Sequence, residues 1–446
     1  MSASNKLRSM ALNALLSERG ETLRRRFRDV RRRVLRRRHK VSVFLQLDDP
    51  YSYLLAYYLP ALEQSFDIDL RLYLCEAQGG GYQPEAEMLA EYAVVDCRRL
   101  ARELGIPFLD QGATPPVEHR RAMLDAIASL SDENDRAALL RASLAVFWRG
   151  DAEAAARITS GTKDPAGNGD VLVSENQQRL RRLGHYNSAM LHYEGEWYWG
   201  VDRLHYLIER LGALGAATES SPDPLLASIQ PAMQVTLPVA PPAAAKALPA
   251  LELFHSVRSP YSYLALRRMF EIADAFGLVL QIRPVLPMIM RGLQVPKPKL
   301  IYIVTDSGRE ARQRDIAFGR IADPVGKGVE RSLAVWRYAR SERRERDYLV
   351  NLGEAIWARG IDVSTDKGMR KVTGRTGLFW PDVVAAMQGE EWRDEVVANR
   401  DSMMASGLWG VPVIRLGDFV TWGQDRDWLL VRHIEELCDT GDGILV

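Results

Sequence analysis

The five residues PYSYL occur twice in this chain, from Pro50 and from Pro260, and each copy has the same surroundings. An apolar run precedes each copy, VSVFLQL from Val41 and LELFHSV from Leu251, and its length and composition predict a buried β-strand. A helical pattern follows, and then a second apolar run, IDLRLYL in one copy and LVLQIRPV in the other. The chain therefore predicts a strand–helix–strand unit twice.

The two halves also end alike. The sequences WGVDRL, from Trp199, and WGQDRDW, from Trp422, follow predicted hairpins that turn at Glu194-Gly195 and Gly417-Asp418. Each half is thus expected to contain βαβ, a helical middle and a ββα ending. This order predicts an α/β fold in which each domain has a mixed sheet, helices on both of its faces and an inserted helical subdomain.

The same pattern predicts the domain boundaries. A chain of 446 residues is too long for one ordinary core. We expect a basic helical extension over residues 1–40, a first domain over 41–213, a linker over 214–250 and a second domain over 251–446. The linker is rich in proline and alanine, which predicts an extended, semi-rigid segment.

The N-terminal extension concentrates the positive charge of a chain whose formal net charge is only +1. Leu23, Phe27, Val30 and Val34 fall on one helical stripe with arginines around it. Such a helix binds an anionic membrane surface or nucleic acid, or packs its stripe on the protein's own body. The sequence leaves these alternatives open, and it also leaves a homodimer open.

Cysteine usage and hydropathy indicate the compartment. Cys75, Cys97 and Cys438 are far apart and form no Cys-x-x-Cys pair, which argues against a dithiol redox centre and a cysteine-rich zinc site, and we expect no metal. No apolar run reaches about 18 residues, so no transmembrane segment is expected, and the N-terminus lacks a secretory h-region. The expected localisation is cytoplasmic.

Ser259 precedes Pro260, whereas Asp49 precedes Pro50 at the matching position. Both residues are good helix N-caps, and proline is favoured at the first helical position, so capping alone explains both. The serine has a second use, because a helix N-terminus favours an anion and a hydroxyl can donate to a bound thiolate. A carboxylate would repel that thiolate. The exchange therefore predicts one working site, in the second half, and one scaffold copy.

The segments SPYSYLAL, from Ser259, and GLWGVPVIRLGDFVTWGQDRDWL, from Gly407, resemble the glutathione-dependent thioredoxin-fold family of 2-hydroxychromene-2-carboxylate isomerases and kappa-class glutathione transferases, within the DsbA-like group. The resemblance covers residues 251–436 and, more faintly, 41–213. It implies two DsbA-like thioredoxin domains as a tandem duplication.

The resemblance also implies site residues. Ser259 lies where the family places the serine that activates the glutathione sulfur, and Val411-Pro412 matches the family's Val-Pro with a cis proline. Gln424 and Asp425 match the segment that holds the γ-glutamyl end. Lys297 or Lys299 is expected to contact the glycyl carboxylate.

Two departures qualify the match. Ser256 stands where the family has an acid, and Arg258 beside the serine either strengthens the positive field or signals a different substrate or cofactor. In the first half, Ser188-Ala189 replaces Val-Pro, so that domain is expected to be degenerate and non-catalytic. His255 is interpreted as a partner of a backbone group rather than a base.

The sequence therefore predicts a glutathione-dependent isomerase or transferase that acts on an aromatic electrophilic small molecule. Trp336, Tyr338 and Trp357 are expected to line the substrate pocket, with Met288 and Met290 as further walls. The alternative is a non-catalytic tandem thioredoxin-fold scaffold. A DsbA-like disulfide oxidoreductase is a weaker alternative, because position 259 holds no attacking cysteine.

Overall fold

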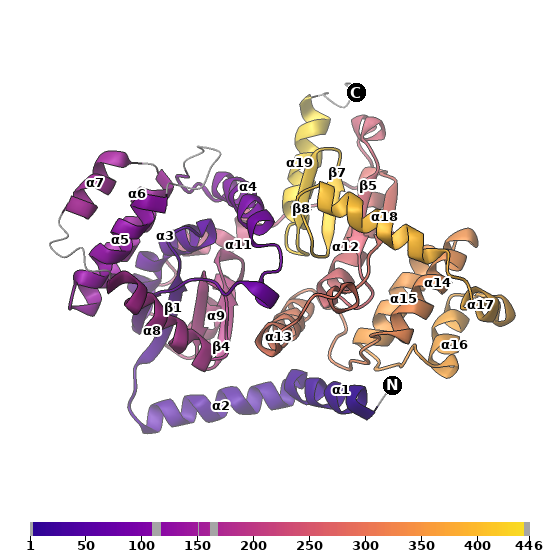
Figure 1. Ribbon diagram of the computed structural model, residues 1–446, viewed down its shortest axis with the longest axis horizontal. Helices are drawn as coiled ribbons and strands as arrows, with labels where there is room; N and C mark the ends of the chain where they lie inside the picture. The colour runs from indigo at the N-terminus through magenta and orange to yellow at the C-terminus, as the bar shows by residue number, and fades with distance from the viewer. Residues whose placement is uncertain (1–2, 109–116, 150, 161–167, 441–446) are drawn as a thin grey trace. The chain divides into compact units, whose positions relative to one another are not determined.

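The computed structural model describes residues 3–108, 117–149, 151–160 and 168–440. The chain forms two compact units, which we call the N-terminal unit, residues 24–234, and the C-terminal unit, residues 1–23 and 235–446. Each unit contains its own four-stranded sheet (Figure 1).

The sheet of the N-terminal unit has the order β2-β1-β3-β4. Strands β1 and β2 are parallel and are joined by α3, and β3 pairs antiparallel with both β1 and β4. Their bounds are β1 His39–Leu45, α3 Pro50–Ser65, β2 Ile68–Leu74, β3 Met190–Tyr193 and β4 Glu196–Trp199. Val41, Val43 and Phe44 of the central strand are fully buried, so this strand anchors the core.

The sheet of the C-terminal unit has the same arrangement, in the order β6-β5-β7-β8. Its central strand pairs parallel with β6 and antiparallel with β7, for example at Leu253 with Ile282 and Ile414. The elements are β5 Leu251–His255, α12 Pro260–Phe276, β6 Leu280–Pro284, β7 Val413–Leu416, β8 Phe419–Trp422 and α19 Asp427–Thr440. The two mixed sheets confirm the predicted fold class.

A helical insertion separates the second strand from the hairpin in each unit, as predicted. The N-terminal unit inserts α4 Ala86–Leu104, α5 Val117–Ser129, α6 Glu133–Arg149, α7 Ala152–Ser160 and α8 Asn168–Arg182, and α9 Leu204–Ala213 follows the hairpin. The C-terminal unit inserts α13 Lys297–Gln313, α14 Lys327–Ser341, α15 Glu345–Trp357, α16 Asp366–Arg375, α17 Trp380–Ala386 and α18 Trp392–Ala405.

Individual contacts recur between the units as well. The Tyr51 hydroxyl donates to Asp96 on α4 at 2.8 Å, and the Tyr261 hydroxyl donates to Asp306 on α13 at 2.9 Å. Asp96 and Asp306 lie as far apart in sequence as Asp49 and Ser259 do. A stacked pair of rings also recurs, Phe108 on Trp148 and Phe318 on Trp357. The two Tyr–Asp bonds fix the first helix of the insertion against the helix that begins at the motif, and the ring pairs pack a later insertion helix.

The segment 214–250 is not simply extended. It contains the short helices α10 Pro224–Ala227 and α11 Ile229–Ala232 and the 3₁₀ turn η3 Ala243–Ala247, which contact α3, α4 and α19 respectively. Leu226, Ile229 and Ala245 are buried there. The reason is local, because the Asp223 side chain caps α10 and Pro224 fills its first position.

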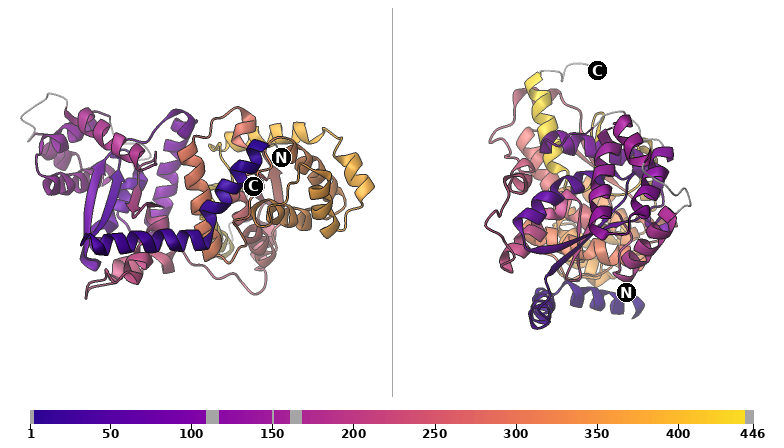
Figure 2. Two further views of the ribbon diagram at one scale, coloured as in Figure 1. Left: turned by 90° about the horizontal axis from the view of Figure 1, so that it is seen from below. Right: turned by 90° about the vertical axis from the view of Figure 1, so that its left-hand side faces the viewer.

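The N-terminal extension forms α1 Ala3–Leu16 and α2 Glu18–Val34 (Figure 2). Leu12 and Leu16 of α1 are buried, and α1 contacts α13. The apolar stripe of α2 is exposed, so the interpretation in which it packs on the protein's own body is wrong. Over the described part of the chain, every helix is too short or too polar to cross a membrane.

Candidate functional site

The candidate site begins where α12 begins. Ser259 has an extended backbone, and its Oγ accepts the Ser262 N–H at 3.1 Å, which caps the helix. The Ser259 hydroxyl also donates to the Val411 carbonyl at 3.4 Å. This separation is long for an O–H···O bond, which is commonly about 2.7–2.8 Å, so the hydroxyl is only weakly held. The Val411–Pro412 bond is cis, as the resemblance implied.

Arg258, beside the capping serine, is held in a buried ion pair. Its Nε and Nη2 donate to the two carboxylate oxygens of Asp323 at 2.7 and 2.8 Å. The carboxylate cancels the charge of the guanidinium. Asp323 therefore reduces the positive field that Arg258 would add at Ser259, and the effect of Arg258 on a bound thiolate stays a prediction.

His255 and Ser256 lie buried between β5 and the cap. Burial lowers the pKa of His255 to about 3, so its imidazole is neutral, and its ring packs edge-on against Trp336 at 5.8 Å. Among the described residues, neither His255 Nδ1 nor Ser256 Oγ has a hydrogen-bond partner. The predicted backbone partner of His255 is therefore not found at Nδ1, and two unsatisfied polar atoms lie within a few residues of Ser259.

Gln424 and Asp425 lie in the turn after β8. This turn is tied to the cis proline, because the Gly423 N–H donates to the Pro412 carbonyl at 3.0 Å. The buried Gln424 side chain donates to Glu310 on α13 at 3.2 Å. The Asp425 carboxylate lies 3.7 Å from Arg426. Glu310 was not predicted from the sequence, although an acidic residue on the buried face of α13 could have indicated a polar site there.

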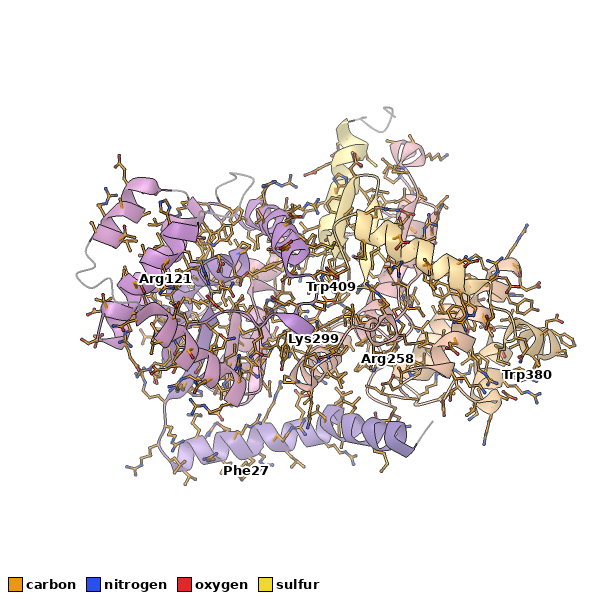
Figure 3. All side chains as sticks on the ribbon, in the orientation of Figure 1. Phe27, Arg121, Arg258, Lys299, Trp380 and Trp409 are labelled. Atoms are coloured by element: carbon orange, nitrogen blue, oxygen red, sulfur yellow. The ribbon has the colours of Figure 1, made fainter. Side chains whose placement is uncertain are left out.

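Lys297 and Lys299 occupy the first turn of α13, but their environments differ. Lys297 is exposed, whereas Lys299 is buried, with its ammonium 5.1 Å from the centre of the Trp409 ring (Figure 3). Burial lowers the pKa of Lys299 to about 8, which leaves it mainly cationic near neutral pH. Trp409 is held in turn by Trp422, at 5.5 Å, and by Arg291, which donates to its carbonyl at 2.8 Å. Lys299 is therefore the lysine that packs on the segment leading to Val411.

The N-terminal unit carries a carboxylate at the same place. Asp49 accepts the Tyr51 N–H at 3.1 Å and the Ser52 hydroxyl at 2.7 Å, so the cap is retained. Burial raises the pKa of Asp49 to about 6, against the hydrogen bonds from Ser52 and Ser188. This carboxylate lies at the N-terminus of α3, in the position that the Ser259 hydroxyl occupies at the N-terminus of α12.

Several other polar positions of the candidate site are also replaced in the N-terminal unit, although Asp202 matches Asp425. At matching sequence positions, Leu89 stands for Lys299, Leu100 for Glu310 and Val201 for Gln424, and Ser188-Ala189 replaces Val411-Pro412. The scaffold contacts of the two Tyr–Asp pairs are kept. The hydroxyl of Ser259 and the polar side chains of Lys299, Glu310 and Gln424 are thus specific to the C-terminal unit.

The tryptophans predicted to line a pocket are packing residues. Trp336 is fully buried and donates to Glu345 at 2.6 Å, and buried Trp357 stacks on Phe318 at 5.8 Å. Tyr338 donates to Asp382 at 3.2 Å on the exposed side of α14. These contacts correct the prediction, because helix–helix packing occupies the rings. Met288 and Met290 are half-buried, and their role stays a prediction.

Residues 250–435 match the family model of the DSBA-like thioredoxin domain. The fold is DsbA-like. Two relatives named 2-hydroxychromene-2-carboxylate isomerase are similar to this chain: one from Sphingobium xenophagum is 23% identical over 188 residues, and one from Pseudomonas putida is 24% identical over 199. The alignments cover 40% and 42% of this chain and 93% and 95% of the relatives.

Two solved structures are similar to this chain at low identity. A 2-hydroxychromene-2-carboxylate isomerase structure has a TM-score of 0.38 and 22% identity, covering 44% of this chain and 100% of that one. The cytosolic disulfide reductase DsbM from Pseudomonas aeruginosa, in a structure with GSH, has a TM-score of 0.32 and 15% identity, covering 42% of this chain and 99% of that one.

Proposed function

We propose that the C-terminal unit is a glutathione-dependent isomerase or transferase that acts on an aromatic electrophilic small molecule. The observation that carries the proposal is the Ser259 hydroxyl at the N-terminus of α12, 3.4 Å from the carbonyl that precedes the cis proline. The N-terminal unit, with Asp49 and without the proline, is proposed to be non-catalytic. We further propose that the two units arose by tandem duplication, as their shared strand order supports.

The residues present fit the chemistry of glutathione, which has one thiol, one α-amino group and two carboxylates. Ser259 and the α12 N-terminus would receive the sulfur, and the Val411 backbone would pair with the cysteinyl peptide. Gln424 and Asp425 would hold the γ-glutamyl end, where Asp425 offers a carboxylate to the amino group. Lys299, or exposed Lys297, would meet the glycyl carboxylate as a cation.

When bound, glutathione supplies a sulfur nucleophile that adds reversibly to an activated carbon and is regenerated. The residues around it stabilise negative charge. The Ser259 hydroxyl exchanges its long bond to Val411 for a donated bond to an anion, and the N–H groups of the first α12 turn add their partial positive charge. The Arg258–Asp323 pair is neutral as a unit, and neutral His255 adds no competing charge.

The names of the two relatives favour, as the substrate, an aromatic compound with an isomerisable bond.

Cys75 and Cys97 are buried and, with Cys438, form no disulfide among the described residues, which supports a reducing compartment such as the cytoplasm. The same cysteines offer no reactive pair for disulfide exchange.

The experiment is a comparison of three full-length proteins: wild type, Ser259→Ala and Thr365→Ala. Thr365 caps α16 through Gly368 in the same way that Ser259 caps α12, so the two variants lose a similar cap, worth about 1 kcal/mol. Millimolar glutathione is expected to raise the melting temperature of the wild type and of Thr365→Ala. Thiolate absorbance near neutral pH should disappear only in Ser259→Ala.

Two results would contradict the proposal. An absent thermal shift in the wild type would remove glutathione as the cofactor and favour the alternative, a non-catalytic scaffold, which the absence of the family acid at Ser256 supports. An unchanged thiolate signal in Ser259→Ala would remove the role assigned to the hydroxyl.

A further inference from the structure

Helix α2 presents its apolar residues outward. Leu23, Phe27, Val30 and Val34, which we call the α2 stripe, are 66%, 69%, 51% and 75% exposed. Figure 3 shows Phe27 on the side of α2 that faces away from the rest of the N-terminal unit. Exposed single hydrophobic residues are common in soluble proteins, but four on one face of one helix form a continuous patch.

The opposite face of α2 is held to the protein by charge. Arg25 donates to both carboxylate oxygens of Glu196 on β4, at 2.8 and 2.9 Å. Arg32 pairs with Asp29 at 2.8 Å within the helix. An amphipathic helix on a soluble protein normally buries its apolar face and leaves its charges in water. Helix α2 has the opposite arrangement, because its charged face contacts the protein and its apolar stripe is exposed. The stripe can therefore contact another surface.

Arginines border the α2 stripe on both sides. Arg26 and Arg31 are exposed and flank Phe27 on the helical wheel, and Arg19 extends the border by two turns. In the described part of the chain none of these three arginines has an ion pair. A long cationic side chain at the edge of an apolar strip can reach anionic groups while its methylenes stay with the strip.

The partner must therefore offer an apolar layer to the α2 stripe and negative charge to the arginines on either side of it. A nucleic-acid backbone satisfies the arginines but gives Phe27 and Val34 no apolar contact. A second copy of the helix would bury the two stripes but bring the arginine borders together. An anionic lipid bilayer provides both, with acyl chains below a layer of negative headgroups.

We propose that the α2 stripe and its arginine border bind the surface of an anionic phospholipid bilayer, with the helix lying in the plane of the interface. The interaction is reversible and does not span the membrane, because one short helix buries a limited apolar area. It would place the C-terminal unit at a surface into which apolar aromatic compounds partition. The binding itself does not depend on the function proposed for that unit.

The test is co-sedimentation of the full-length protein with phosphatidylcholine vesicles, with and without phosphatidylserine. The Phe27→Glu variant removes the centre of the stripe, and Phe379→Glu, at a residue 65% exposed in the C-terminal unit, is its matched control. The double variant Arg26→Gln/Arg31→Gln removes the border. Its control, Arg181→Gln/Arg182→Gln, makes the same charge change at the exposed end of α8.

Wild type is expected to sediment with phosphatidylserine vesicles, and added salt should release it. Loss of the two border arginines should weaken binding by roughly 25-fold, at about fivefold for each arginine. Phe27→Glu should abolish sedimentation, while both controls and the glutathione response stay at wild-type values. No sedimentation of the wild type, equal binding to neutral vesicles, or unaltered binding of Phe27→Glu would each overturn the proposal. Two further results would overturn it. One is duplex DNA that binds the wild type and Phe27→Glu with equal affinity, which would indicate a nucleic-acid site. The other is a wild-type dimer that Phe27→Glu dissociates, which would indicate a second copy of the chain as the partner.

Discussion

Replacing Ser259 by aspartate introduces the residue that the N-terminal unit carries at the same position. Asp49 shows how a carboxylate fits there, because its oxygens accept the Tyr51 N–H at 3.1 Å and the Ser52 hydroxyl at 2.7 Å. The equivalent donors, Tyr261 and Ser262, begin α12. We therefore expect Ser259→Asp to fold with a stability within about 1 kcal/mol of wild type at about pH 5, since serine and aspartate are comparable N-caps. With the raised pKa of Asp49, an aspartate at 259 should cost roughly 3 kcal/mol of stability at about pH 8.

The affinity for glutathione should fall steeply in Ser259→Asp at about pH 8. A carboxylate at the cap would lie about 4 Å from a thiolate, and two such charges repel by about 4 kcal/mol at an effective dielectric constant of about 20. That energy corresponds to a loss of affinity of roughly 1,000-fold. Ser259→Ala loses only a donor to a charged group, so its affinity should fall by about tenfold to 100-fold.

The assay is a calorimetric titration of glutathione into wild type, Ser259→Ala and Ser259→Asp. Because burial raises the pKa of Asp49 to about 6, we expect an aspartate at 259 to be charged at about pH 8 and to lose its repulsion toward about pH 5. The gap between the two variants should therefore narrow as the pH falls. Equal affinity of the two variants at about pH 8 would refute the charge argument for the serine–aspartate exchange.

Three further predictions concern stability, each measured by urea unfolding of the full chain. Because the pKa of Asp49 is raised, its carboxyl should contribute a loss of roughly 3 kcal/mol as the pH rises from about 4 to above 6, measured as the change in the stability difference between wild type and Asp49→Asn. A pH profile that Asp49→Asn leaves unchanged would contradict this. The lowered pKa of His255 acts in the opposite direction, so its imidazole should contribute a loss of roughly 2 kcal/mol as the pH falls from about 6.5 to 5. His255→Leu, which introduces the residue found at Leu45, should remove that contribution, and a stability difference between wild type and His255→Leu that stays constant with pH would count against it. Asp323→Asn leaves Arg258 buried without its carboxylate and should cost roughly 3 kcal/mol or more, whereas a cost below about 1 kcal/mol would show that the pair is well solvated.

Periodicity and cap chemistry made much of the fold predictable. Apolar runs of strand length, a Ser-Pro or Asp-Pro helix start and paired hairpins placed both sheets, because each signal acts over a few neighbouring residues. The same local rule explains the miss in the linker, where Asp223-Pro224 starts a helix in a segment interpreted from composition alone. Composition averages over residues and cannot show that Leu226 finds a place to pack.

The polar contacts of the candidate site were less predictable. Glu310 reaches Gln424 only because α13 packs beside the turn after β8, and nothing near Arg258 in sequence indicates Asp323 as its partner. The choice of Lys299 over Lys297 as the buried lysine likewise depends on which side of α13 faces Trp409. The exposure of the α2 stripe had to be observed, because an amphipathic pattern defines two faces without stating which one packs inward.

The central claim is that the C-terminal unit stabilises a glutathione thiolate through Ser259 and the α12 N-terminus. Titration of the full-length protein with glutathione near neutral pH, in buffers of different ionisation enthalpy, counts the protons released on binding. The account predicts about one proton released per glutathione bound, since binding lowers the pKa of the thiol, and a much smaller release for Ser259→Ala. Binding without proton release, or release that Ser259→Ala leaves unchanged, would contradict it.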